Sequence, residues 1–272
     1  MDQALTFDRT ADVSKLNGCN TRGLEYRWDI FNRHLSGISG GTALDFGAGS
    51  LRESFDLASR GFAVTSVDID ATTLAAYKAK YCWPDENGPS IIVDADMVSA
   101  LAKVDAGKFK IITCFDVLEH LSDPTSTLKS LSERLADDGL LFVSVPNGRT
   151  LFELAWSIDL KIARATGRHI RPGEPHLQRH SPARWREIIE RAGLSIIEHD
   201  MQIGFFANNA AALVQVPLSL SGRFLRKAGV KLDAGTASER IIARIAPTMS
   251  ALDRRTSFLR NLYGWNLFVL AR

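Results

Sequence analysis

The chain has 272 residues, of which 45% are hydrophobic and 24% charged, as in an ordinary globular protein of one large domain or one domain with insertions. Its net charge of +2 is unevenly distributed. Residues 1–160 carry 15 Lys and Arg against 23 Asp and Glu, whereas residues 161–272 carry 18 against 8. The basic second part is typical of a protein that contacts an anionic substrate or surface, although basic side chains that only solvate helices give the same balance.

Cysteine content and hydropathy exclude several classes of protein. The three cysteines are odd in number and form no Cys-x-x-Cys motif, so we expect no disulfide framework and a reducing, cytoplasmic location. The N-terminus lacks a basic-then-apolar signal sequence. The most apolar stretch, 205–220, is interrupted by polar residues and a proline, which excludes a transmembrane span there.

A strand, a glycine turn and a helix follow one another in residues 43–60. The apolar run 43–46 predicts a buried strand that carries Asp45 near its end, and Gly47 and Gly49 form the turn before a helical pattern over 51–60. This order predicts the first crossover of a doubly wound α/β sheet. Glycine lets a ligand approach the backbone closely, and the helix N-terminus offers N–H groups to a negative group of that ligand.

The residues of this turn favour a ligand other than a dinucleotide. The third glycine of a dinucleotide fingerprint is missing, and the Asp45 carboxylate would repel a pyrophosphate. S-adenosylmethionine (SAM) carries ammonium and sulfonium groups and no phosphate, so it suits a carboxylate at this place. From this motif alone, another nucleotide-binding α/β protein, such as a nicotinamide-dependent oxidoreductase, remains an alternative.

Acidic residues also follow the second and third predicted strands. The second strand, 62–67, leads into Asp68 and Asp70. A carboxylate at the end of this strand can accept the ribose hydroxyls of an adenosine, and we expect Asp68 in this role, with helix capping as the alternative. We expect Asp70 to cap the next helix. The third strand, 91–93, leads into Asp94-Ala95-Asp96.

The remaining elements continue the alternation of strands and helices. We predict a helix over 22–35 on the sheet edge, a helix over 72–81, a strand over 109–115, a helix over 124–135 opened by Pro124, a turn at Asp138 and Gly139, a strand over 140–145, helices over 151–165 and from Ser181 to Gly193, and strands over 194–201 and 264–270.

The fourth strand is followed by Asp116-Val117-Leu118-Glu119-His120-Leu121-Ser122-Asp123-Pro124. Together with the glycine turn and Asp68, this segment resembles the class I SAM-dependent methyltransferases, and most of all the ubiquinone-type O-methyltransferases. The resemblance covers 40–201 and 264–271. It implies an α/β fold with a doubly wound, mostly parallel seven-stranded sheet and helical insertions, and SAM as the cofactor.

The resemblance also implies an organisation and a cofactor site. The chain would comprise an N-terminal helical segment that covers the cofactor (1–40, with Tyr26, Arg27 or Trp28 in reach), a SAM-binding core (41–201, with an insertion at 147–180), a basic helical cap (202–262) and a last core strand (263–272). The implied cofactor-binding residues are Asp45, Gly47, Gly49, Asp68, Ile69, Asp94, Ala95 and Phe115, with Asp96 as the alternative to Asp94 at the adenine.

Methyl transfer from SAM requires an electron-rich atom in line with the methyl group and a base for its proton. His120 is the expected general base, because the unperturbed pKa of histidine, about 6.5, suits proton uptake at neutral pH. His176 and His180 are second choices, in a segment, 167–180, with three His and three Arg that is expected either to contact substrate or to be a solvated loop.

A more specific hypothesis gives the same segment a metal ion. Asp116, Glu119 and His120 have the i, i+3, i+4 spacing of one helical face, and His176 or His180 could supply a fourth ligand. Similar acid-x-x-Glu-His patterns hold Mg²⁺ or another divalent ion in ubiquinone-type O-methyltransferases and in small-RNA 2′-O-methyltransferases. In this chain the first acid is Asp, where those families have Glu.

We therefore expect a SAM-dependent methyltransferase that methylates an oxygen of a small, sugar-linked or lipid-linked, anionic acceptor. The alternatives are a metal-assisted RNA 2′-O-methyltransferase and a SAM-binding protein without catalysis. We expect no DNA partner. The basic stretch within 205–262 is expected to grip an anionic substrate, to contact a membrane peripherally or to form a subunit interface.

Overall fold

The computed structural model describes residues 31–80, 88–105, 107–165, 167, 176–201, 244–245, 248–249, 251–252, 255–256 and 266–272. The expected cofactor contacts of Tyr26, Arg27 and Trp28, and most of the basic cap 202–262, lie outside these residues. The chain divides into two compact units. One comprises 31–146, 170–200 and 267–272 and contains most of the sheet, and the other comprises 1–30, 147–169 and 201–266.

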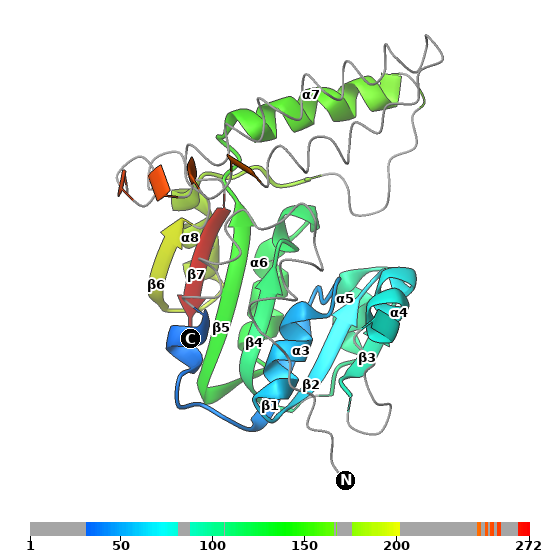
Figure 1. Cartoon of the computed structure of the whole chain (residues 1–272), viewed down its shortest axis with the longest axis vertical. Helices are drawn as coiled ribbons and strands as arrows, with labels where there is room; N and C mark the ends of the chain where they lie inside the picture. Colours follow the sequence, from blue (N-terminus) through cyan, green and yellow to red (C-terminus); the bar gives the residue numbers. More distant parts are fainter. Residues whose placement is uncertain are drawn as a thin grey trace. The chain divides into compact units, whose positions relative to one another are not determined.

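The described residues form one seven-stranded sheet, which confirms the predicted fold class (Figure 1). Its strand order is β3-β2-β1-β4-β5-β7-β6. The strands are β1 (Gly41–Phe46), β2 (Phe62–Asp68), β3 (Ser90–Val93), β4 (Phe109–Phe115), β5 (Leu135–Pro146), β6 (Ile196–Met201) and β7 (Asn266–Ala271). β1 pairs in parallel with both β2 and β4, so the strand order reverses at β1, where doubly wound folds bind their ligands.

Helices connect the parallel strands. They are α3 (Arg52–Ser59), α4 (Ala71–Lys80), α5 (Met97–Ala102), α6 (Pro124–Ser132) and α8 (Pro182–Arg191), with a short 3₁₀ helix, η1 (Leu118–His120), after β4. Because such crossovers are right-handed, α3 and α4 cover one face of the sheet and α5, α6 and α8 the other. The predicted helix start at Pro124 is confirmed, with Asp123 as the N-cap, and the helix predicted from Ser181 begins at Pro182 with Ser181 as its N-cap. α5 was not predicted from the sequence.

The last strand enters the sheet from the opposite direction. Ser195 and Arg272 exchange two backbone hydrogen bonds, of 2.8 and 3.1 Å, which is the pattern of an antiparallel pair. Figure 1 shows β7 between β5 and β6, pointing the opposite way to β6. The sheet is therefore mostly parallel, as expected, with one antiparallel element formed by β6 and β7.

The predicted turn at Asp138 and Gly139 is wrong, because both residues lie within β5. Phe109 pairs with Leu135 but Ile111 pairs with Leu140, so β5 bulges away from β4 between these pairs. A Cβ atom on Gly139 would lie 2.9 Å from the carbonyl oxygen of Phe109. Glycine at this position therefore marks a close backbone approach in the bulge rather than the end of a strand.

Aromatic side chains fill the core on one face of the sheet. Residues 31–35 are helical, and Phe31 and Leu35 are each 1% exposed. The Phe31 ring packs edge-on against Phe142 of β5 (4.8 Å between centroids) and Phe115 of β4 (6.3 Å). The described end of the predicted helix 22–35 thus lies on the middle strands of the sheet and not at its edge.

The other unit contains α7 (Leu151–Ala165), whose bounds are those predicted for this helix. No helix among the described residues has both the length and the apolar character that a membrane span requires.

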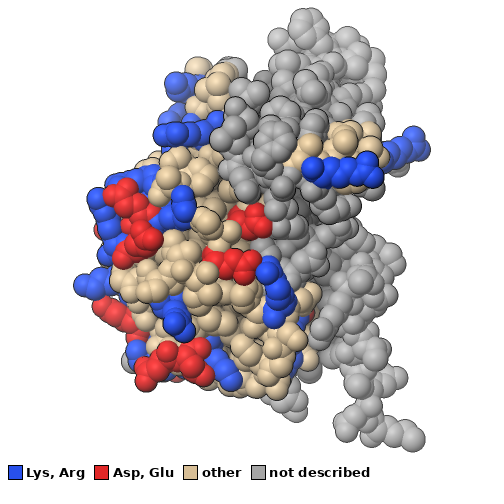
Figure 2. All heavy atoms as spheres, turned by 90° about the vertical axis from the view of Figure 1, so that its left-hand side faces the viewer, with Lys and Arg blue, Asp and Glu red and all other residues tan. Residues whose placement is uncertain are grey.

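On the face shown in Figure 2, basic and acidic side chains of the described residues are interspersed. On α8, Glu187 pairs with both Arg184 (2.6 Å) and Arg191 (2.5 Å).

Candidate active site

The glycine turn after β1 packs against the segment that follows β4. The backbone N–H groups of Gly47 and Ala48 both donate to the carbonyl oxygen of Val67 in β2, at 2.8 and 3.0 Å. Gly47 has φ +88°, and a Cβ atom there would lie 2.1 Å from Cγ2 of Val117. Glycine is therefore required both by the backbone conformation and by the contact with Val117.

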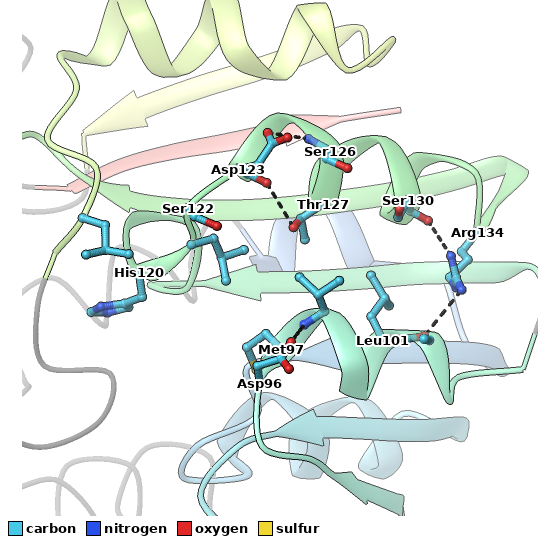
Figure 3. A pocket seen from close by; sticks show the side chains of 14 residues that line it. Asp96, Met97, Leu101, His120, Ser122, Asp123, Ser126, Thr127, Ser130 and Arg134 are labelled. Carbon is cyan, nitrogen blue, oxygen red and sulfur yellow. Dashed lines mark hydrogen bonds between the residues drawn. The ribbon is translucent and has the colours of Figure 1, made fainter.

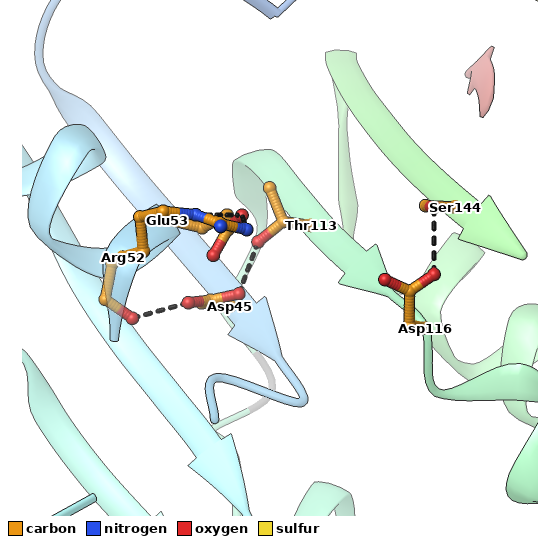
Figure 4. A network of polar contacts seen from close by, with 7 residues as sticks. Asp45, Arg52, Glu53, Thr113, Asp116 and Ser144 are labelled. Atoms are coloured by element: carbon orange, nitrogen blue, oxygen red, sulfur yellow. Dashed lines mark hydrogen bonds and ion pairs between the residues drawn. The ribbon is translucent and has the colours of Figure 1, made fainter. Parts of the chain in front are cut away.

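Asp45 lies beneath this turn in a buried polar network and is only 3% exposed (Figure 4). Its two carboxylate oxygens accept hydrogen bonds from Oγ of Ser54 (2.6 Å) and Oγ1 of Thr113 (2.7 Å). Burial raises the pKa of Asp45 to about 7, and the neighbouring Glu53 carboxylate adds to the rise. The expected cofactor-binding acid thus braces β1, α3 and β4 from within the protein.

A buried ion pair begins α3. Arg52 and Glu53 are 7% and 6% exposed, and Nε of Arg52 donates to Oε1 of Glu53 at 3.0 Å. Arg52 occupies the third-glycine position of a dinucleotide fingerprint, and Leu51 before it adopts a left-handed conformation with φ 54°. A left-handed conformation costs a non-glycine residue about 1 kcal/mol, and here the Leu51 side chain is fully buried.

Asp68 connects the end of β2 to the glycine turn. One of its carboxylate oxygens accepts from the N–H of Gly49 (2.7 Å), and the other from the N–H groups of Ile69 (2.7 Å) and Asp70 (2.9 Å). Three backbone N–H groups therefore hold the carboxylate between the end of β2 and the glycine turn. Asp70 accepts from the N–H groups of Thr72 and Thr73, which confirms it as the helix cap.

The two acids after β3 have different partners. Asp96 is the N-cap of α5 and accepts from the N–H groups of Val98 and Ser99. Asp94 forms an ion pair with Lys103 (2.8 Å) and accepts from the N–H of Ala95, and these bonds lower its pKa. The capping role of Asp96 was the signal by which α5 could have been found in the sequence.

The spacing of Asp116, Glu119 and His120 does not place them on one helical face. Asp116 precedes η1 and has φ 58°, so it lies outside any helix. Its N–H donates to the carbonyl oxygen of Ser144 (2.9 Å), and its carboxylate accepts from Oγ of Ser144 (3.0 Å) (Figure 4). The Asp116 side chain is therefore turned toward β5. Phe115, before it, packs against Phe268 (6.0 Å between centroids).

Glu119, His120 and His176 form the principal cluster of titratable groups near the end of β4. Glu119 is 2% exposed, and its Oε1 lies 3.8 Å from Nε2 of His120. The rings of His120 and His176 pack edge to face at 4.9 Å between centroids. One ligand atom from each of the three residues lies within 4.8 Å of the others.

His180 lies outside this cluster. Its ring packs against Trp185 at 5.0 Å between centroids, and burial, followed by the charge of Arg184, lowers its pKa. Nε1 of Trp185 donates to the carbonyl oxygen of Pro146. Of the two histidines considered as a further ligand or base, the structure brings His176 to His120 and leaves His180 in the packing around α8.

A groove of about 620 Å³ runs between α5 and α6 and ends at His120 (Figure 3). Its apolar lining includes Met97, Leu101 and Leu177, and Arg134 lies at the end opposite His120. Of the three residues of the cluster, His120 lines this groove, which is large enough for a small molecule. The sequence analysis did not anticipate it, because its walls come from separate segments.

A family model described as a methyltransferase domain matches residues 22–199. The chain belongs to the methyltransferase domain family. A ubiquinone biosynthesis O-methyltransferase from Actinobacillus pleuropneumoniae serotype 5b is 35% identical over 129 residues, which are 46% of this chain and 53% of that protein. The chain thus spans about half the length of the curated relatives it matches.

Solved structures of methyltransferases share the fold of this family member. A SAM-dependent methyltransferase from Archaeoglobus fulgidus superposes with a TM-score of 0.53 at 17% identity, covering 91% of this chain and 92% of that one. Phosphoethanolamine N-methyltransferase 2 from Haemonchus contortus, in complex with SAM, has a TM-score of 0.57 at 15% identity, covering 95% and 55%. SAM is the cofactor of this family.

Proposed function

We propose that this methyltransferase transfers the methyl group of SAM to an oxygen of a small-molecule acceptor, with His120 as the general base. The observation that carries this proposal is the cluster of Glu119, His120 and His176 beside the end of β4. Val117 links this segment to the glycine turn through its contact with Gly47. A base and a cofactor loop that meet in this way suit methyl transfer.

In the proposed reaction, the acceptor hydroxyl gives its proton to His120 while its oxygen forms a bond to the methyl carbon. SAM, when bound, would supply the methyl group and would leave as its neutral thioether product. The buried Glu119 carboxylate, 3.8 Å from the His120 ring, stabilises the imidazolium and orients the ring. Asp116 acts on the site by holding the turn before η1 against β5.

The proposed cofactor residues are those at the ends of the first four strands. Asp68 would accept the ribose hydroxyls, since its carboxylate is already oriented by three backbone N–H groups. Gly47 and Gly49 would allow close approach of SAM, with Asp45 supporting the turn from below. The other proposed contacts are Ile69, Asp94, Ala95 and Phe115.

The acceptor is proposed to carry its hydroxyl on a largely apolar body. The relatives named as ubiquinone biosynthesis O-methyltransferases support an O-methylated small molecule. The groove between α5 and α6 supports an apolar body, because it combines Met97 and Leu101 with access to His120. A sugar-linked, lipid-linked or anionic acceptor stays a prediction, since most of the basic cap lies outside the described residues.

A second proposal for how the acceptor hydroxyl is activated is a divalent cation bound by the cluster, and the donor atoms of the cluster support it. One carboxylate and two imidazoles would hold such an ion through Glu119, His120 and His176. It would lower the pKa of an acceptor hydroxyl bound to it. The ligand set differs from the expected one, because Asp116 faces Ser144 and His180 faces Trp185.

Replacement of His120 tests the proposal. We expect His120→Gln to lower turnover of a catechol acceptor by roughly 10²- to 10⁴-fold, because the general base is lost. SAM affinity, measured by calorimetry, should be unchanged. The matched control is His199→Gln, which changes a histidine of β6 that contacts Arg186.

Full activity of His120→Gln would contradict the assignment of the base. SAM binding without methyl transfer to any acceptor would instead support a non-catalytic SAM-binding protein. The same assay with and without a chelator tests the cation, since activity that survives exhaustive chelation excludes it.

A further inference from the structure

Four hydrogen bonds join the residues around His176 to the turn that carries His120. The backbone N–H groups of Leu177 and Gln178 both donate to the carbonyl oxygen of Glu119, at 2.7 and 2.9 Å. The side-chain amide of Gln178 donates to the carbonyl oxygens of Leu121 (3.0 Å) and Ser122 (3.1 Å). Gln178 therefore takes part in three of the four bonds.

Neither of the two joined segments is held by regular secondary structure of its own. η1 is a single 3₁₀ turn of three residues, and residues 176–180 lie outside any helix or strand until α8 begins at Pro182. The ring contact between His120 and His176 thus depends on bonds between the segments. About 57 positions separate them in sequence.

We propose that Gln178 is a positioning residue that assembles the active site by fixing His176 against His120. This inference rests on the proposed function of the cluster. The backbone bonds to Glu119 anchor the segment at one point, about which it could still rotate. The side-chain amide of Gln178 adds a second point of attachment, at the carbonyl oxygens of Leu121 and Ser122. Two separate points of attachment fix the orientation of the segment that carries His176.

The chemistry of the side chain explains why glutamine suits this place. Its NH₂ group has two donors, and two carbonyl oxygens receive them. Glutamate at this position has no donor when ionised and would face both carbonyl oxygens with a negative charge. Methionine has similar length and no donor. Both substitutions therefore remove the side-chain anchor without removing the bulk of the residue.

Kinetics of Gln178→Met test the proposal. We expect kcat to fall roughly 10- to 100-fold while KM and SAM affinity stay unchanged, because His176 would no longer hold the base, His120, in place, and a displacement of the base by about 1 Å costs that much. Adding His176→Ala to Gln178→Met should lower kcat no further, since both changes remove the same contact. Ser181→Ala is the matched control, because it removes the N-cap of α8 but leaves the four bonds in place.

NMR of the histidine rings gives a readout that does not depend on turnover. In the otherwise unchanged protein, His120→Gln should shift the His176 ring signals, because the two rings are in contact. In the Gln178→Met protein the same replacement should leave them unshifted. Gln178→Glu serves as the second variant if Gln178→Met does not fold.

The two proposals fail in different ways. An undiminished shift of the His176 signals in the Gln178 variants, or an unchanged kcat, would overturn the positioning role. If the shift depends on Gln178 but the unsubstituted protein methylates no acceptor, the positioning role stands and the proposed function fails.

Discussion

The ends of β1 and β4 carry the two halves of the candidate site, and they are held in different ways. In the half around β1, Asp45 at the end of β1 accepts hydrogen bonds from hydroxyls, and Asp68 at the end of the neighbouring β2 accepts from a backbone N–H of the glycine turn. At the end of β4, His120 depends on a segment more than fifty positions away. The proposed cofactor half is held largely by bonds within residues 45–70, with Thr113 of β4 as a distant partner of Asp45, whereas the proposed catalytic half combines two segments that lie outside regular strands and α-helices and are joined by bonds over more than fifty positions.

Val117 joins these two halves, because it follows β4 and packs against Gly47 after β1. The comparison therefore predicts that changes in the β1 half should affect stability and SAM binding together. Changes at Gln178 should affect turnover and leave both intact. Substitutions of Asp45, Gly47 and Asp68 in the β1 half should have effects on stability that decrease in this order.

Replacing Asp45 should remove a pH dependence of stability. Its pKa is raised by burial from 3.8 to about 7, so the folded state binds its proton more tightly than the unfolded state. The resulting stabilisation is complete below about pH 4 and is lost as the pH rises through 7, and it amounts to on the order of 4 kcal/mol. Asp45→Asn should lack this dependence in denaturant unfolding between pH 4 and 8.

The exposed Asp105 offers the matched control for this experiment. Asp105→Asn should show the same pH profile as the unsubstituted protein. A profile of Asp45→Asn that parallels both would show that the carboxyl is ionised in the folded state throughout this range.

Gly47→Ala should break the contact between the two halves. We expect it to lower the free energy of unfolding by about 3 kcal/mol, because alanine is strained at φ +88° and its Cβ atom would overlap Val117. Adding Val117→Ala should recover the part of this loss in the free energy of unfolding that the overlap with the Val117 side chain causes. Gly37→Ala is the control, since Gly37 has φ +79° with no atom near its Cβ position, and should cost only about 1 kcal/mol. Equal losses for both glycines would show that the Val117 contact is unimportant.

Asp68→Asn should have the smallest effect on stability and a clear effect on the cofactor. We expect the free energy of unfolding to fall by about 2 kcal/mol, because the two carboxylate oxygens accept from the N–H groups of Gly49 and Ile69, whereas the asparagine side chain has only one oxygen that can accept. SAM affinity, measured by calorimetry, should fall roughly tenfold. Asp70→Asn, which alters only the cap of α4, should leave SAM affinity unchanged.

Patterns of apolar residues predicted most of the fold. The bounds of β4 and α7 match the prediction, and those of α3 and α4 differ by one residue at each end. The errors lie where tertiary contacts overrode a local signal. Asp138 and Gly139 have turn composition, but the sheet extends through them as a bulge, because Gly139 lets the backbone pass the Phe109 carbonyl.

For the candidate site, a local sequence pattern pointed to some residues and misled about others. The residues around Asp45, Gly47 and Asp68 were identified because strand, turn and acid follow one another directly in the chain. The prediction that Asp116, Glu119 and His120 lie on one helical face was wrong, because their spacing implies a shared face only if a helix forms. The bond between Asp116 and Ser144 turns the first acid toward β5 instead.

The sequence by itself determined the strand–glycine turn–helix unit, the acids at the strand ends and membership of a SAM-binding fold, because these depend on short-range periodicity and backbone conformation. Only the tertiary structure decided that His176 and not His180 accompanies His120, that Gln178 bonds to the turn carrying His120, and that a groove leads to His120. These features depend on hydrogen bonds and packing between segments far apart in the chain, for which no local pattern exists.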